Sequence, residues 1–120
     1  MAAPNIVNVT SIYGKTIGAS LGTTVTTSLL TCASEKLYKI NSIIVSNIDG
    51  TNDADVTIYF YDGSNDWPLA RLITVPAKST LIVLGKDAPI YLEESDQIRG
   101  GASANGDLDV VISYEELDDA

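Results

Sequence analysis

The sequence contains no histidine and only one cysteine, Cys32. Histidine is the usual general base near neutral pH and the commonest metal ligand, so its absence removes the Ser-His and Cys-His nucleophile pairs and the usual zinc ligand. A lone cysteine cannot form an intrachain disulfide, nor a thiolate metal site by itself. Because free cysteine is among the most buried residue types, we expect Cys32 to be a buried, unreactive thiol.

Basic residues are also scarce: 7 Lys and Arg stand against 16 Asp and Glu, which gives a net charge of −9. Proteins that bind nucleic acids neutralise phosphates with clustered Lys and Arg, and anionic membranes attract the same clusters. The few basic residues here are scattered along the chain. The sequence therefore predicts no nucleic-acid partner and no membrane partner.

Long hydrophobic runs are absent. The longest unbroken aliphatic stretch is Leu81–Leu84, whereas about 18 apolar residues are needed to span a bilayer. The first seven residues include neither a basic segment nor a long apolar one, so we expect no signal peptide and synthesis in a cytosol.

The sequence does contain many Val, Ile, Thr and Tyr residues, which favour strands. Apolar and polar residues alternate along much of its length, as in residues 56–61 and 108–114, and this is the pattern of half-buried strands. The other predicted strands are residues 6–13, 23–32, 37–48, 69–75, 80–85, 90–92 and 97–102. Polar and glycine-containing turns separate them at residues 49–52, 62–65, 76–78, 85–87 and 105–107.

These patterns predict an all-β protein: a single antiparallel β-sandwich of about eight or nine strands, jelly-roll or immunoglobulin-like, over residues 1–120. Residues 1–5 are expected to form a flexible N-terminal arm and residues 115–120 a solvated acidic tail. The predicted core consists of the following apolar residues: Tyr38, Ile40, Ile44, Val56, Ile58, Phe60, Leu81, Val83, Val110 and Ile112.

A search for catalytic chemistry yields little. Adjacent acidic pairs such as Glu93-Glu94 and Glu115-Glu116 do not converge, because neighbouring residues on a strand point to opposite faces. Gly14-Lys15-Thr16 resembles the end of a phosphate-binding loop, but Val9 stands where that loop needs glycine and no helix is predicted after it. We therefore interpret residues 14–16 as a turn that ends a strand. The sequence predicts no catalytic residue, no cofactor and no enzymatic activity.

Two loops offer weaker candidates for binding. Asp49, Asp53 and Asp55 could supply oxygen ligands to calcium, although the spacing does not match the helical calcium loop, so a polar turn without metal is the favoured interpretation. Trp67, the only tryptophan, is expected in a loop, where it could cover the core or act as a contact anchor. Together with Ile6, Val7 and Val9 it forms the set of interface candidates.

The order of motifs between Asn41 and Tyr114 resembles small structural proteins from the particles of marine tailed bacteriophages, notably those of cyanobacteria. The opening residues 4–10 add to the likeness. The segments that carry it are residues 43–51, 54–58, 75–81, 86–94, 102–108 and 112–116.

This resemblance implies a β-sandwich building block of a phage particle, made in the host cytoplasm and assembled into the virion. Its most favoured position is on the capsid, as a decoration protein in contact with the major capsid protein. We expect it to be a homo-oligomer, with a trimer as the favoured state, because several strands are apolar on both faces. The alternatives are a head-to-tail or tail component, or a carbohydrate-binding module for host recognition that would use Tyr59, Tyr61 and Trp67.

Overall fold

The computed structural model describes residues 11–85 and 87–118. The predicted N-terminal arm and the interface candidates Ile6, Val7 and Val9 lie outside these residues. Every regular element in the described part of the chain is a strand, and they are β1 (Ser11–Ser20), β2 (Ser28–Thr31), β3 (Lys36–Asn47), β4 (Ala54–Tyr61), β5 (Asp66–Val75), β6 (Thr80–Leu84), β7 (Ile90–Leu92), β8 (Gln97–Ala102) and β9 (Leu108–Asp118).

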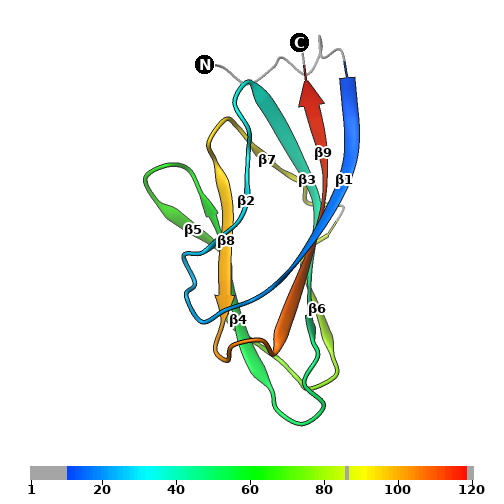
Figure 1. The fold of residues 1–120 in the computed structure, drawn as a ribbon, viewed down its shortest axis with the longest axis vertical. Helices are drawn as coiled ribbons and strands as arrows, with labels where there is room; N and C mark the ends of the chain where they lie inside the picture. Colours follow the sequence, from blue (N-terminus) through cyan, green and yellow to red (C-terminus); the bar gives the residue numbers. More distant parts are fainter. Residues whose placement is uncertain (1–10, 86, 119–120) are drawn as a thin grey trace.

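The strands form two packed antiparallel sheets (Figure 1). The first, sheet A, has the order β1-β9-β3-β6, with β7 also paired to β3; the second, sheet B, has the order β2-β8-β4-β5. The pairs are nested along the chain: β1 with β9, β2 with β8, β3 with β6 and β7, and β4 with β5. A long hairpin rolled up in this way is a jelly roll, so the predicted all-β sandwich is confirmed and its strand order is of the jelly-roll kind.

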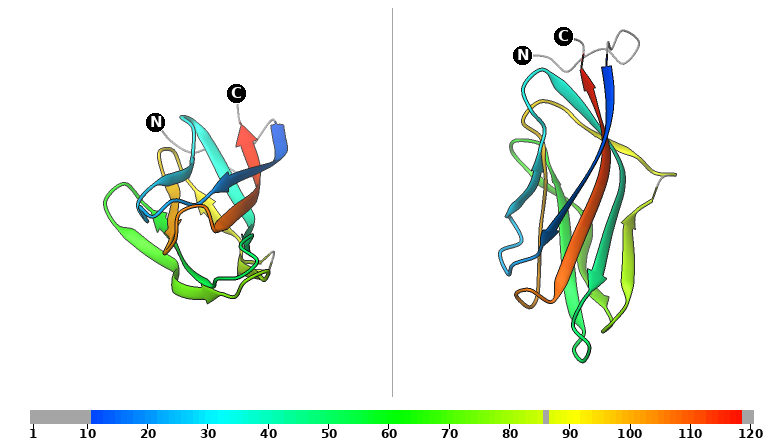
Figure 2. Two further views of the ribbon diagram at one scale, coloured as in Figure 1. Left: turned by 60° about the horizontal axis from the view of Figure 1, so that its bottom comes forward. Right: turned by 45° about the vertical axis from the view of Figure 1, so that its right-hand side comes forward.

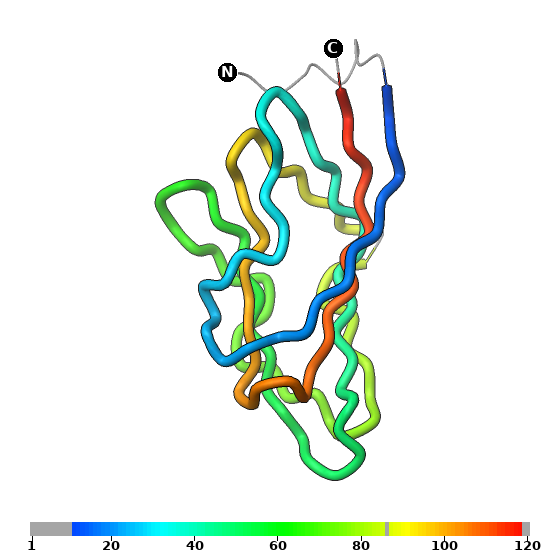
Figure 3. Tube along the Cα trace, viewed as in Figure 1, coloured from blue at the N-terminus to red at the C-terminus, as the bar shows by residue number. Residues whose placement is uncertain are grey.

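The chain passes repeatedly between the sheets, and the first passage shapes one edge of the molecule (Figure 3). After β1 the segment 21–27 leaves sheet A and runs along β8. The N–H groups of Ala102 and Gly100 donate to the carbonyls of Gly22 and Thr27, at 2.8 and 3.0 Å. The segment therefore covers an edge of sheet B that the short strand β2 would leave bare.

The core lies between the sheets and is made of alternate residues of the long strands. Six predicted core residues are buried: Tyr38, Ile40, Val56, Ile58, Val110 and Ile112. Phe60, Leu81 and Val83 are partly buried and pack against this core. The two views of Figure 2 show the layers around it.

Ile44 is the exception, and a β-bulge explains it. The pairing of β3 with β9 shifts between Ile40 and Ser42, so one extra residue enters β3 there. An extra residue moves each later side chain of the strand to the opposite face of the sheet. Ile43 and Val45 therefore point into the core, whereas Ile44 faces outward.

Three other predictions about local structure were wrong. Residues 14–16 are not a turn, because β1 continues through them with unbroken pairing to β9. Trp67 lies in β5 and not in a loop, since Pro68 is tolerated on a strand at the edge of a sheet. The expected acidic tail is largely strand: residues 115–118 continue β9, and Glu116 and Leu117 are buried. Residues 119–120 lie outside the described part.

Candidate functional site

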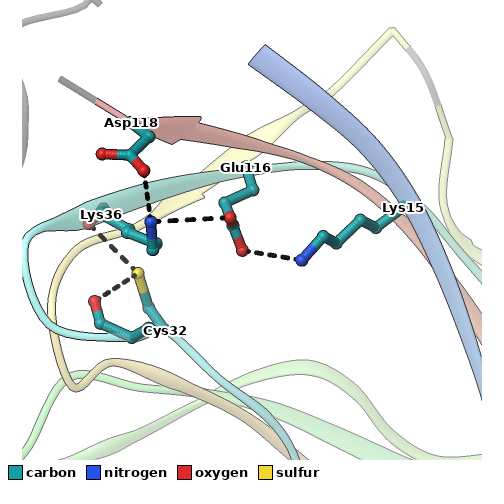
Figure 4. Close-up of polar contacts among 6 residues, drawn as sticks. Lys15, Cys32, Lys36, Glu116 and Asp118 are labelled. Carbon is teal, nitrogen blue, oxygen red and sulfur yellow. Dashed lines mark hydrogen bonds and ion pairs between the residues drawn. The ribbon is translucent and has the colours of Figure 1, made fainter. Parts of the chain in front are cut away.

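A group of ion pairs lies at the end of sheet A, where β1, β3 and β9 run side by side (Figure 4). Glu116 is 7% exposed. Its Oε1 is 3.1 Å from Nζ of Lys15, and its Oε2 is 3.7 Å from Nζ of Lys36. The Lys36 ammonium also contacts Asp118 Oδ2 at 2.6 Å. These contacts join three strands.

The charges in this group stabilise one another. The hydrogen bond to Glu116 raises the pKa of Lys15, and the hydrogen bond to Asp118 raises the pKa of Lys36. Both lysines thus remain protonated, and each positive charge faces a carboxylate. A group of paired charges of this kind ties the three strands together. Sequence analysis missed it because the acidic segment was assigned to a solvated tail.

Cys32 lies beside this group and is buried, as predicted. Its thiol contacts the carbonyl oxygen of Lys36 at 3.3 Å. Burial raises the pKa of the Cys32 thiol from its ordinary value of 9.0 to about 12. The thiolate is the reactive form of cysteine, so this side chain is poorly suited to nucleophilic chemistry at neutral pH.

Alkaline pH is therefore expected to weaken the fold. The folded chain holds the Cys32 proton more tightly than the unfolded chain, so this contribution to stability is complete below pH 9 and is lost as the pH rises toward 12. We expect the free energy of unfolding from urea titrations to fall by about 2–3 kcal/mol between pH 8 and pH 11. A Cys32→Ala variant should lose less over this interval. An equal loss in both proteins would contradict this assignment to the thiol.

The calcium candidates do not gather at one point. Asp49 Oδ1 accepts hydrogen bonds from the N–H groups of Thr51 and Asn52, whereas Asp53 Oδ1 accepts one from the N–H of Ala77. Asp55 Oδ1 accepts the hydroxyl of Thr74 at 2.8 Å. Each carboxylate thus has its own protein donor.

A wider search gives the same result. Nowhere in residues 11–85 and 87–118 do three His, Cys, Asp or Glu side chains lie close enough to hold a metal ion. The absence of a metal remains a prediction.

The carbohydrate-binding alternative needs Tyr59, Tyr61 and Trp67 on one face of the molecule, but the structure divides them between the two faces of sheet B. Trp67 is opposite Phe60 in the β4–β5 pair, and Tyr61 is opposite Asp66, so Trp67 and Tyr61 point to opposite sides of sheet B. The indole N–H of Trp67 donates to Asp62 Oδ2 at 2.8 Å and holds the pKa of that carboxyl below its ordinary value. The ring of Tyr61 already carries the guanidinium of Arg99, 3.4 Å from its centroid.

A row of apolar side chains lies on the outer face of sheet A, and we call it the apolar row. Val111 in β9 is opposite Ile44 in β3, and Ile44 is opposite Ile82 in β6. Ile82 is 65% exposed and Val111 is 41% exposed. Sequence analysis expected apolar surface on these strands, but it could not identify the residues because the bulge in β3 decides which of them face outward.

Comparison with known proteins gives no relative: no family model, no curated protein and no solved structure matches this chain. The likeness to phage proteins therefore rests on the sequence motifs alone. Within residues 11–85 and 87–118, no helix has the length and apolar character needed to cross a membrane.

Proposed function

We propose that this protein is a structural component of a tailed-phage particle, which decorates the exterior of the capsid and acts through its surfaces. The motifs between Asn41 and Tyr114 support the proposal by resemblance. The jelly-roll strand order also supports it, since this architecture recurs in viral capsid proteins. It recurs in lectins as well, so the fold alone does not assign the role.

The observation that carries the proposal is the apolar row. It crosses three strands of the outer face, with Thr16 and Ser113 3.2 Å apart on one side of the row and Ser46 and Thr80 3.1 Å apart on the other. Asp109 lies on the same face, opposite Ser46. The row itself can meet a partner through shape and apolar contact without desolvating a charge of its own. The partner we propose is the shell formed by the major capsid protein.

The distribution of charge supports the same surface. Most of the acidic residues lie in loops or near strand ends, and the apolar row and the adjoining pair Thr16 and Ser113 carry no charge, while Asp109 lies on the other side of the row, opposite Ser46. A protein with a net charge of −9 is repelled by other acidic surfaces. This uncharged part of sheet A therefore allows closer approach than the loops do.

The proposal predicts cosedimentation with emptied phage heads that lack the protein. Replacing Ile82 with serine should weaken binding on the order of tenfold, since a buried Ile side chain is worth about 1.5–3 kcal/mol. Ile48→Ser is the matched control, because Ile48 is 61% exposed but lies after β3 and outside the apolar row. The control should bind as the original protein does.

Three outcomes would contradict the proposal. The first is failure of the unchanged protein to sediment with heads. The second is sedimentation with isolated tails in preference to heads, which would assign it to the tail. The third is binding to a glycan array without binding to particles, which would favour the carbohydrate-binding alternative.

A further inference from the structure

A sheet edge exposes unpaired N–H and C=O groups, and proteins usually protect such edges with short strands, bulges or proline. Three edges of this sandwich are protected in that way. β2 has four residues and a bulge, and β6 has five residues and a bulge. β5 is longer, but it contains Pro68, two breaks in its pairing with β4, and a left-handed residue, Leu72, with φ of 52°.

The fourth edge, β1, has no bulge or proline and is not short; the protecting charge that it carries, Lys15, is drawn to Glu116 of the same chain. It runs for ten residues without proline, and its pairing with β9 is continuous from Ser11 to Ser20. Among the described residues, no strand pairs with its other side. Two large apolar residues near its start are also exposed: Ile12 at 60% and Tyr13 at 50%.

The hydrogen-bond pattern shows which groups of β1 face outward. The N–H of Leu21 donates to the carbonyl of Leu108 at 2.9 Å, in the same register as the rest of the β1–β9 pair. In an antiparallel pair, hydrogen-bonded positions alternate with positions whose groups point away. The odd-numbered residues of β1 therefore bond to β9, and the backbone groups of Ile12, Gly14, Thr16 and Gly18 point to the free edge.

The charge of β1 also favours contact between copies of this acidic chain. Its one charged residue is Lys15, whose ammonium is paired with Glu116. Gly14 adds a further sign. A Cβ added there would meet nothing within 4 Å, so packing inside one copy does not require glycine. Glycine inside a strand is typical of places where another backbone approaches closely.

We propose that β1 pairs with β1 of a second copy, antiparallel about a two-fold axis at Thr16. The outward-facing residues must pair with one another, and an axis at Thr16 pairs Gly14 with Gly18 of the second copy. An axis at Lys15 would set two lysines directly opposite, which is destabilising. The free edge of β1 in each copy then pairs with the same strand of the other copy, as a two-fold symmetric contact requires.

This pair differs from the trimer expected from the sequence, which remains a prediction. Because the axis is perpendicular to the sheet, sheet A of both copies becomes one sheet, and the two apolar rows lie on the same side. The inference does not depend on a phage role, since it concerns the isolated chain.

The first test is sedimentation equilibrium of the isolated protein, which should form a dimer. Thr16→Pro removes an outward N–H from each copy and no bond to β9, so it should weaken association on the order of tenfold or more. Its thermal unfolding should change little, because proline is tolerated on an edge strand whose N–H faces outward. Thr16→Val also loses the hydroxyl contact with Ser113 but keeps the N–H, and it should associate as the original protein does.

The second test detects the dimer directly, by crosslinking its two copies. A Thr16→Cys variant should form a disulfide-linked dimer on mild oxidation, since facing Cα atoms about 5.5 Å apart suit a disulfide. Ser20→Cys is the control on the same strand: its two copies would lie roughly 27 Å apart, four residues on either side of the axis. A monomeric or trimeric protein, association unchanged by Thr16→Pro, or equal crosslinking of the two cysteine variants would overturn the proposal.

Discussion

Replacing Gly101 with alanine is expected to destabilise the protein by about 3 kcal/mol or more, at the upper end of the usual cost of overpacking. An added Cβ would lie 2.8 Å from two backbone oxygens, those of Gly22 and Thr24. Neither oxygen can easily move. The Gly22 carbonyl accepts the N–H of Ala102, and the Thr24 carbonyl accepts both the N–H and the hydroxyl of Thr27.

The effect should appear as a lower urea midpoint, and it should be large because a domain of this kind is stable by only about 5–15 kcal/mol. Gly50→Ala is the control: Gly50 lies in a loop outside β1, and its added Cβ meets only Lys78 Cε, at an ordinary 3.6 Å. We expect this control to unfold at or slightly above the original midpoint. Similar midpoints for the two variants would show that segment 21–27 does not lie against β8 as described.

Truncating Ile58 to alanine should cost about 2–5 kcal/mol, the range for deleting a large aliphatic side chain from a core. Ile58 is fully buried in β4. Its side chain packs directly against β8, since a Cβ added at Gly100 would lie only 2.6 Å from Ile58 Cδ1. Removing this side chain would leave a cavity in the core, and the cost depends on how far the neighbouring side chains collapse into it.

The matched control for this truncation is Ile48→Ala, since Ile48 is 61% exposed. Surface substitutions of this kind usually change stability by no more than about 0.5 kcal/mol. Phe60→Ala should have a smaller effect than Ile58→Ala, because Phe60 is only partly buried. A loss below about 1 kcal/mol for Ile58→Ala would contradict its place in the core.

Much of the fold could be predicted from local patterns. Turn residues marked the strand boundaries, and the Asn105-Gly106 pair does form a turn in which Gly106 has a φ of 83°. The alternation in residues 56–61 gave the inward face of β4 correctly for Val56 and Ile58. These features depend on a few adjacent residues, which is why the sequence alone reveals them.

The errors have a common physical cause, which is pairing between distant parts of the chain. The bulge in β3 arises in its pairing with β9, and nothing local to Ile44 indicates that it will face outward. Gly14 looked like the end of a strand, yet β9 pairs with it and carries β1 onward. Glu116 looked solvated, but Lys15 and Lys36 compensate for its burial.

The candidate surfaces were harder to predict than the fold for the same reason. Ile44, Val111 and Ile82 come from three strands, and only the register of sheet A brings them into one row. The free edge of β1 likewise becomes apparent only when the pairing of all the described strands is known. Trp67 was predicted as an interface candidate, and the structure places it in β5 at 52% exposure; its role as a contact remains a prediction.

The central claim is that this protein works as a structural part of a phage particle. Quantitative mass spectrometry of highly purified particles of a phage whose genome carries the gene tests this most directly. We predict that the protein is present at a fixed ratio to the major capsid protein and that the ratio is unchanged when tails are removed from the heads. Absence from purified particles, with the protein abundant in the infected cell, would contradict the claim.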